Sequence, residues 1–158
     1  MGVKSTAILL VVGLAVLLIP PRASAQADDV AVVVNSGNSI TNISLEELRK
    51  LFAGTKRSWT SGHPVRLITR GPGCHERLVL LKLVKMSESE YKQYWTALVF
   101  RGDADAEPSV VPSVGMQREA IIAFSGGITL MNAPEVKPGM KVVKVDGLLP
   151  GAPGYPLH

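Results

Sequence analysis

The sequence predicts an α/β fold, built as one small domain behind a removable leader. Short β-branched apolar runs, typical of strands, alternate with segments that have helical patterns. The connections are short and rich in Gly, Pro, Asn and Ser, and no internal repeat is present. Residues 26–158 are enough for one domain with a modest core.

Residues 1–25 have the three parts of a secretory signal peptide. Lys4 supplies the positive start, an apolar run follows from Ala7 to Ile19, and Ala23-Ser24-Ala25 provides small residues before a cleavage site. The alternative is a membrane anchor, but this run is shorter than the roughly 20 residues of a spanning helix. We therefore expect a periplasmic or secreted protein with no membrane span after signal removal.

Charge and cysteine content exclude several classes of protein. The formal charge of +4 falls to +2 when Lys4 and Arg22 leave with the leader. That charge is too small to indicate binding to nucleic acid or to an anionic membrane. The single cysteine, Cys74, cannot form an internal disulfide, so the core must hold the fold and the thiol is either buried or functional.

The elements can be placed from patterning and from start and stop signals. Ser44 and Glu47 form the capping box of a helix that ends near Gly54, and Ser87 and Glu90 form the box of another. Strands are expected at Val30–Val34, buried on both faces, and at Val65–Thr69, Ile128–Met131 and Met140–Val145. Further helices are expected at Leu78–Val84, central to the core, and at Val114–Phe124. Asn35–Ser39 is expected as a turn, Arg101–Pro112 as a loop, and Gly147–His158 as an extended surface segment.

An aromatic stripe marks the helix that follows Ser87. Tyr91, Tyr94, Trp95 and Leu98 recur at spacings of three and four, which places them on one helical face. We interpret the stripe as core; the alternative is a surface on which a ligand stacks.

The order of motifs resembles that of the phosphate ABC transporter substrate-binding proteins. The stretches that carry the resemblance are Ser44–Gly54, Trp59 with Gly62–Val65, Lys85–Ser87 leading into Tyr91 and Trp95, Val99–Gly102, Ser125–Ile128 and Val143–Gly147. The resemblance covers nearly all of residues 26–158. It implies a type 2 periplasmic-binding-protein-like fold, in which a mixed sheet is flanked by helices. Members have two lobes, and this chain has the length of a single small lobe.

The resemblance also implies a ligand site at the N-terminus of a helix. In the family, a strand ends in Arg and runs through a Gly turn into Ser-Gly-Thr, where backbone N–H groups, hydroxyls and the Arg hold phosphate. The matching stretch here retains Arg70 and Gly73, whereas Cys74, His75 and Glu76 replace Ser, Gly and Thr. A thiol is a weaker donor than a hydroxyl, and the Glu76 carboxylate repels phosphate. The alternative without a binding role is that Arg70 and Glu76 finish the helix end and pair with each other at the surface.

Ser36 and Ser39 offer further hydroxyl donors to the same anion, although turns use these residues for other reasons. The predicted binding residues are therefore Arg70, Gly73, Cys74, His75, Ser36 and Ser39.

Catalysis is not expected, because no coherent set of acid, base and nucleophile is present. Cys74 and His75 are adjacent on a helix and point about 100° apart, which makes a poor nucleophile pair. His63, His75 and His158 lack metal-ligand spacing, so neither a metal nor a cofactor is expected. The expected partners are a small phosphate-like anion and the membrane component of an ABC transporter or another envelope protein. The rival function is a non-catalytic envelope interaction module that kept the fold and lost the ligand.

Cleavage after Ala25 is directly testable. The intact mass of protein recovered outside the cytoplasm should correspond to a chain that begins at Gln26, because the small residues at 23–25 fit the site of signal peptidase. An exported species that retains residues 1–25 would contradict this prediction.

Overall fold

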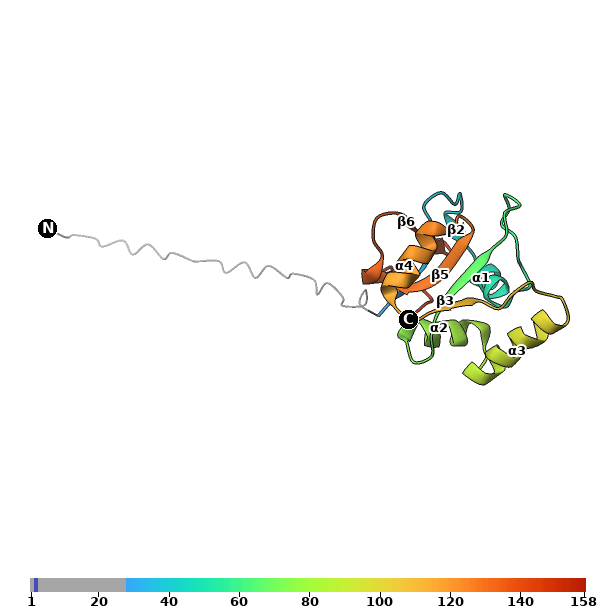
Figure 1. Ribbon diagram of the computed structural model, residues 1–158. Helices are drawn as coiled ribbons and strands as arrows, with labels where there is room; N and C mark the ends of the chain where they lie inside the picture. Colours follow the sequence, from blue (N-terminus) through green and yellow to red (C-terminus); the bar gives the residue numbers. More distant parts are fainter. Residues whose placement is uncertain (1, 3–27) are drawn as a thin grey trace.

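A computed structural model of the chain describes Gly2 and residues 28–158; the predicted signal peptide and its cleavage site lie outside these residues, apart from Gly2. The described part contains a six-stranded mixed sheet with the strand order β2-β6-β1-β5-β3-β4 (Figure 1). The strands are β1 (Val30–Asn35), β2 (Asn42–Ile43), β3 (Arg66–Arg70), β4 (Ser109–Val111), β5 (Gly127–Asn132) and β6 (Met140–Val145). The α/β class and the mixed sheet predicted from the sequence are confirmed.

Within residues 28–158, four α-helices and one short 3-10 helix flank the sheet. The α-helices are α1 (Leu45–Phe52), α2 (His75–Val84), α3 (Glu88–Phe100) and α4 (Val114–Ala123), and the 3-10 helix η2 spans Ala133–Glu135. Ser44 caps α1 by accepting from the Glu47 N–H, but the Glu47 carboxylate pairs with Lys56, so the predicted box is only half formed. Ser87 and Glu90 form the complete capping box predicted for α3. No helix in the described part is long and apolar enough to cross a membrane.

The sheet separates two hydrophobic cores of unequal size. The larger one packs Val30, Val32 and Val34 of β1 against α1, α2 and α3, and the smaller one packs Ala31 and Val33 against α4. Figure 1 shows α4 lying across one face of the sheet, with α2 and α3 beyond the other. Residues 30–34 are fully buried, so the prediction of a strand buried on both faces is confirmed.

The direction of β1 decides which loops share an end of the sheet. β1 pairs antiparallel with β5, whereas β3 pairs parallel with both β5 and β4. β1 therefore runs opposite to β3, and the turn that follows β1 lies at the end of the sheet where β3 begins. The last residue of β3, Arg70, lies at the opposite end of the sheet.

The C-terminal segment departs from the expectation of an extended surface segment. Tyr155 and Leu157 are both buried, and the Tyr155 hydroxyl donates to the Val30 carbonyl at 2.8 Å. The Val30 N–H donates in turn to the Leu157 carbonyl at 2.9 Å. Single apolar residues among Gly and Pro have no helical or strand periodicity, so only the tertiary contact reveals that this segment completes the core.

Two short strands and one exposed leucine were not foreseen. β4 lies inside the expected loop 101–112, and β2 has only two residues, so neither offers a long apolar pattern. In α2, Leu78 is 51% exposed, so this helix is buried on one side rather than all round.

The aromatic stripe of α3 packs inward, as the spacing predicted. Tyr91, Trp95 and Leu98 are buried, and the rings of Tyr91 and Tyr94 both meet the Trp95 ring edge-to-face. The Tyr91 hydroxyl donates to the Phe52 carbonyl at 2.9 Å, and burial raises the pKa of Tyr91 to about 12. The stripe therefore joins α3 to α1, although Trp95 also lines a surface groove described below.

Trp95→Ala should lower the free energy of unfolding by about 3–5 kcal/mol, because it leaves a large cavity between α3 and α1. Chemical denaturation of the wild type and the variant measures this difference. A loss below about 1 kcal/mol would show that Trp95 contributes little to the core.

Candidate anion site at the start of helix α2

The predicted anion site forms where β3 ends and α2 begins. Gly73 has a φ of 86°, a left-handed conformation that favours glycine, and it turns the chain into the helix. Cys74 is the N-cap residue of α2, but its side chain makes no capping hydrogen bond. The first-turn N–H groups of α2 are therefore not capped by the N-cap side chain, and such groups favour a negative charge.

Arg70 is the last residue of β3, and its guanidinium is held by long contacts. It lies 3.4 Å from the Glu76 carboxylate, 3.5 Å from the Cys74 Sγ and 3.3 Å from the Pro112 carbonyl. Its Nε is buried without a hydrogen-bond partner among the described residues. Charge-assisted bonds to a carboxylate are usually about 2.7–2.9 Å, so Arg70 retains capacity for a stronger acceptor.

The Arg70–Glu76 pair exists, but it is not at the surface. The Glu76 side chain is 4% exposed and the Arg70 side chain 11%. The alternative left open by the sequence was an exposed ion pair without a binding role. The low exposure of both side chains corrects that alternative. Glu76 is buried because α2 presents this side to the sheet, and a carboxylate is therefore fixed beside the arginine.

The other predicted residues fall in different places. His75 is exposed, and its Nε2 lies 2.8 Å from the Asp28 carbonyl oxygen, so it contacts the start of the domain. Ser36 and Ser39 are exposed in the turn after β1. Because β1 runs opposite to β3, these two serines lie at the other end of the sheet from Arg70.

The turn after β1 uses its polar groups on its own backbone and on α4. Asn35 accepts from the Gly37 N–H at 2.8 Å and donates to the carbonyls of Ile121 and Ile122. Asn38 accepts from the Ile40 N–H at 3.0 Å. These contacts account for Asn35 and Asn38 without a ligand.

The start of a second helix, α4, lies beside Arg70; the sequence predicted this helix but not its position next to the arginine. β4 is the parallel neighbour of β3, and the chain continues from it through Pro112 into α4, which Ser113 caps. The contact from Arg70 to the Pro112 carbonyl joins the two strand ends. Only the pairing of β4 with β3 brings these segments together, and β4 was itself not foreseen.

Arg77 fixes the helix that carries this site. It is 6% exposed, pairs with Glu88 of α3, and lies 4.9 Å from the centroid of the Tyr91 ring. Hydrogen bonding from Arg77 lowers the pKa of Glu88 below its usual range. The position of the α2 N-terminus is therefore tied to α3 by a largely buried cation.

No protein-family model and no curated protein matches the chain. A phosphate transport receptor of the ABC type from Vibrio cholerae superimposes with a TM-score of 0.62 and 19% identity, over 77% of this chain and 48% of that one. A putative phosphate ABC transporter substrate-binding protein from Clostridium perfringens, solved with bound phosphate, matches with a TM-score of 0.63 and 15% identity. That match covers 77% of this chain and 46% of the other.

PstS from Borrelia burgdorferi matches with a TM-score of 0.56 and 19% identity, over 77% of this chain and 49% of that chain. At these identities the likeness shows the fold. The chain spans under half the length of these three structures, and it has the fold of roughly one lobe of phosphate-binding proteins. The predicted single-lobe fold is thereby confirmed.

The buried pair gives a stability prediction. Arg70→Met alone should lower the free energy of unfolding by about 3–5 kcal/mol, because it leaves the Glu76 carboxylate buried without its cation. The double variant Arg70→Met/Glu76→Leu should recover most of this loss. Urea denaturation compares the three proteins, and equal losses in the single and double variants would contradict the pairing.

Proposed function

We propose that this chain is an exported, solute-binding-like protein that binds a small phosphate-like anion beside Arg70, at the N-terminus of α2. The observation that carries the proposal is the pair of long contacts from Arg70 to oxygen, 3.4 Å to the Glu76 carboxylate and 3.3 Å to the Pro112 carbonyl, together with a buried Nε that has no hydrogen-bond partner among the described residues. An anion with oxygens at ordinary hydrogen-bond distance would be a better acceptor than any of these groups.

Backbone groups support the same location. The first turn of α2 has no side-chain cap, and Gly73 and Cys74 lead into it directly from the strand that carries Arg70. His75 belongs to the proposed site through its backbone N–H, since its ring is turned toward Asp28. Ser36 and Ser39 are excluded from the proposed site because they lie at the other end of the sheet.

The proposed binding is weak, for two physical reasons. A single lobe leaves the anion partly solvated, and the Glu76 carboxylate already lies 3.4 Å from Arg70. Two like charges about 4 Å apart repel by roughly 4 kcal/mol at an effective dielectric of about 20. We therefore expect a dissociation constant on the order of 0.1–1 mM. The proposal involves binding without catalysis, in keeping with the names of the matched receptors and binding proteins.

One observation favours a second function. Glu76 places a buried carboxylate against Arg70, so the chain supplies its own anion where a ligand would bind. In this alternative the protein is a non-catalytic interaction module of the envelope. Its partner would be the membrane component of an ABC transporter or another envelope protein.

Calorimetric titration with phosphate, sulfate and small carboxylates separates the two functions. Glu76→Thr should strengthen phosphate binding at least tenfold, because it removes a like charge and restores a hydroxyl donor. Arg70→Met/Glu76→Thr should bind no anion, and this double variant avoids leaving a carboxylate buried alone. Arg101→Met serves as a control, because Arg101 is exposed and pairs with Asp103 away from the site.

Binding to the wild type should weaken as salt rises, because the attraction is electrostatic. If neither the wild type nor Glu76→Thr binds any of these anions, the solute-binding proposal is wrong and the interaction module takes its place.

A further inference from the structure

A groove of about 620 Å³ lies at the end of the sheet where β3 begins, opposite the end that carries Arg70. Along β3 the two regions are separated by roughly 13 Å, at about 3.3 Å per residue. The groove is formed by the loop after α1, the start of β3, the loop that leads into β4 and the turn before β5. Its volume is in the range of about 300–1,000 Å³ that is usual for sites of small ligands.

Arginines line one part of this groove. Arg66, the first residue of β3, places its guanidinium 4.2 Å from the centroid of the Phe124 ring, and Arg57 donates to the Asp103 carbonyl. Among residues 28–158, neither arginine has a carboxylate oxygen within 4.0 Å. Within the described part of the chain, neither cation therefore has an ion-pair partner, although each contacts an aromatic ring or a carbonyl.

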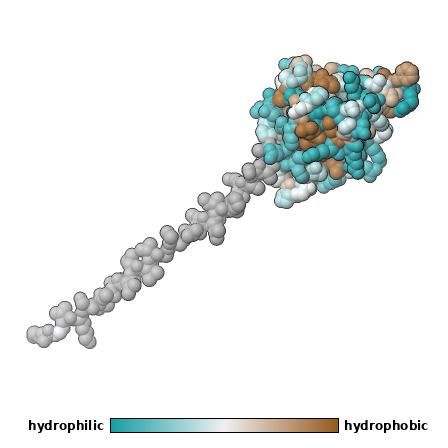
Figure 2. Space-filling view, turned by 90° about the horizontal axis from the view of Figure 1, so that it is seen from below, coloured by the Kyte–Doolittle hydropathy of each residue, from teal (hydrophilic) through white to brown (hydrophobic). Residues whose placement is uncertain are grey.

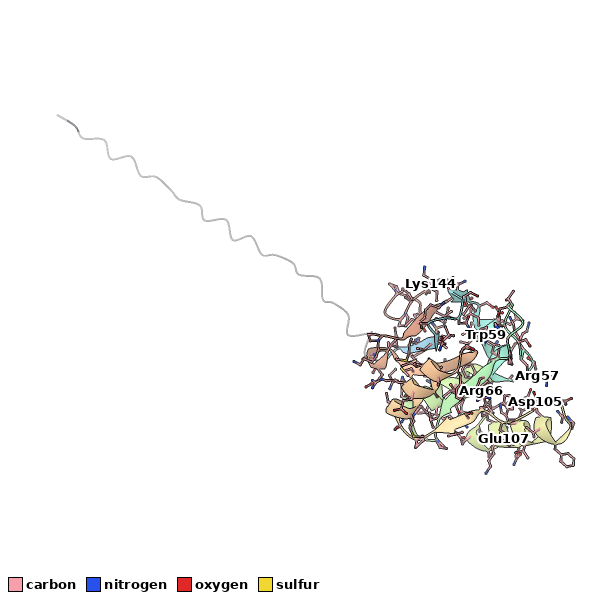
Figure 3. All side chains as sticks on the ribbon, turned by 45° about the horizontal axis from the view of Figure 1, so that its top comes forward. Arg57, Trp59, Arg66, Asp105, Glu107 and Lys144 are labelled. Carbon is pink, nitrogen blue, oxygen red and sulfur yellow. The ribbon has the colours of Figure 1, made fainter. Side chains whose placement is uncertain are left out.

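Carboxylates line another part of the same groove. Asp105 and Glu107 come from the loop between α3 and β4, and Glu107 accepts from the Thr96 hydroxyl at 2.8 Å. Figure 3 shows Arg57, Arg66, Asp105 and Glu107 gathered around the start of β3 and the loop beyond α3. Because these opposite charges face one groove without forming ion pairs, a gap separates them.

Apolar side chains line the same groove. Val65, Leu67 and Trp95 line the groove, and the Trp95 ring also touches Gly54 behind it. The turn before β5 is held close by the Trp59 indole, which donates to the Gly126 carbonyl at 3.0 Å. A Cβ at Gly126 would lie 2.1 Å from the Pro64 carbonyl oxygen, so glycine is required at this wall.

We propose that this groove binds a short peptide with free termini, with its carboxylate at Arg66, its ammonium group at Asp105 and its apolar side chain against Val65. Charge complementarity selects a ligand with both charges, because an anion alone would face the two carboxylates. The volume selects a peptide of a few residues over a single amino acid, which would leave most of the groove filled with water.

The tripeptide alanyl-leucyl-alanine is a suitable probe for calorimetric titration of the mature protein. Its affinity should fall about tenfold or more in Arg66→Gln and in Asp105→Asn, because each variant removes a charged partner. Arg101→Gln and Glu46→Gln are matched controls that should leave it unchanged, since both residues are exposed and lie outside the groove lining.

Capped peptides make the assignment of the two ends testable. The amidated peptide should bind Arg66→Gln and the wild type equally, and the acetylated peptide should bind Asp105→Asn and the wild type equally.

Absence of saturable binding, equal affinities for capped and free peptides, or equal losses in the control variants would each overturn the proposal. Free leucine binding as tightly as the tripeptide, or competition by inorganic phosphate, would overturn it as well. Because Arg70 and Glu76 lie at the other end of β3, their variants should not affect peptide binding, so the two proposals fail independently.

Discussion

The burial of β1 on both faces is the constraint on which the rest of the structure depends. Its five fully buried residues point alternately into the larger core, which packs against α1, α2 and α3, and into the smaller core, which packs against α4. Its edges pair antiparallel with β5 and β6, and its first residue is bonded to the C-terminal segment. A strand in this position has no freedom to reverse or to slip, because a one-residue shift would exchange its two packed faces.

That constraint distributes the polar loops between two ends of the molecule. The ends of β3 and β4, with the starts of α2 and α4, gather around Arg70. The turn after β1, the start of β3 and the turn before β5 gather at the opposite end. Each end of the described domain therefore offers its own chemistry: a largely buried arginine beside an uncapped helix start at one end, and a groove lined by unpaired opposite charges at the other.

The face of the domain seen from below is mostly hydrophilic (Figure 2). In the view from below, apolar side chains show in small patches among polar ones (Figure 2). Phe100, at the end of α3, is 91% exposed, and Leu78 of α2 is about half exposed. Single apolar residues of this kind are normal on the surface of a protein. The two polar ends are therefore the regions whose chemistry needs an explanation.

The sequence by itself determined the α/β class and the burial of residues 30–34 on both faces of the sheet. It also determined the N-caps of α1 and α3 and the inward orientation of Tyr91 and Trp95. Each of these features is a local periodicity or a short-range hydrogen-bond pattern. The sequence also identified Arg70 at a strand end and Gly73 in the turn. Only the tertiary structure decided that Glu76 is buried against Arg70, that Ser36 and Ser39 lie far from it, and that Tyr155 closes the core. These facts depend on strand direction and on pairing between residues distant in the chain, and no local pattern of side chains encodes them.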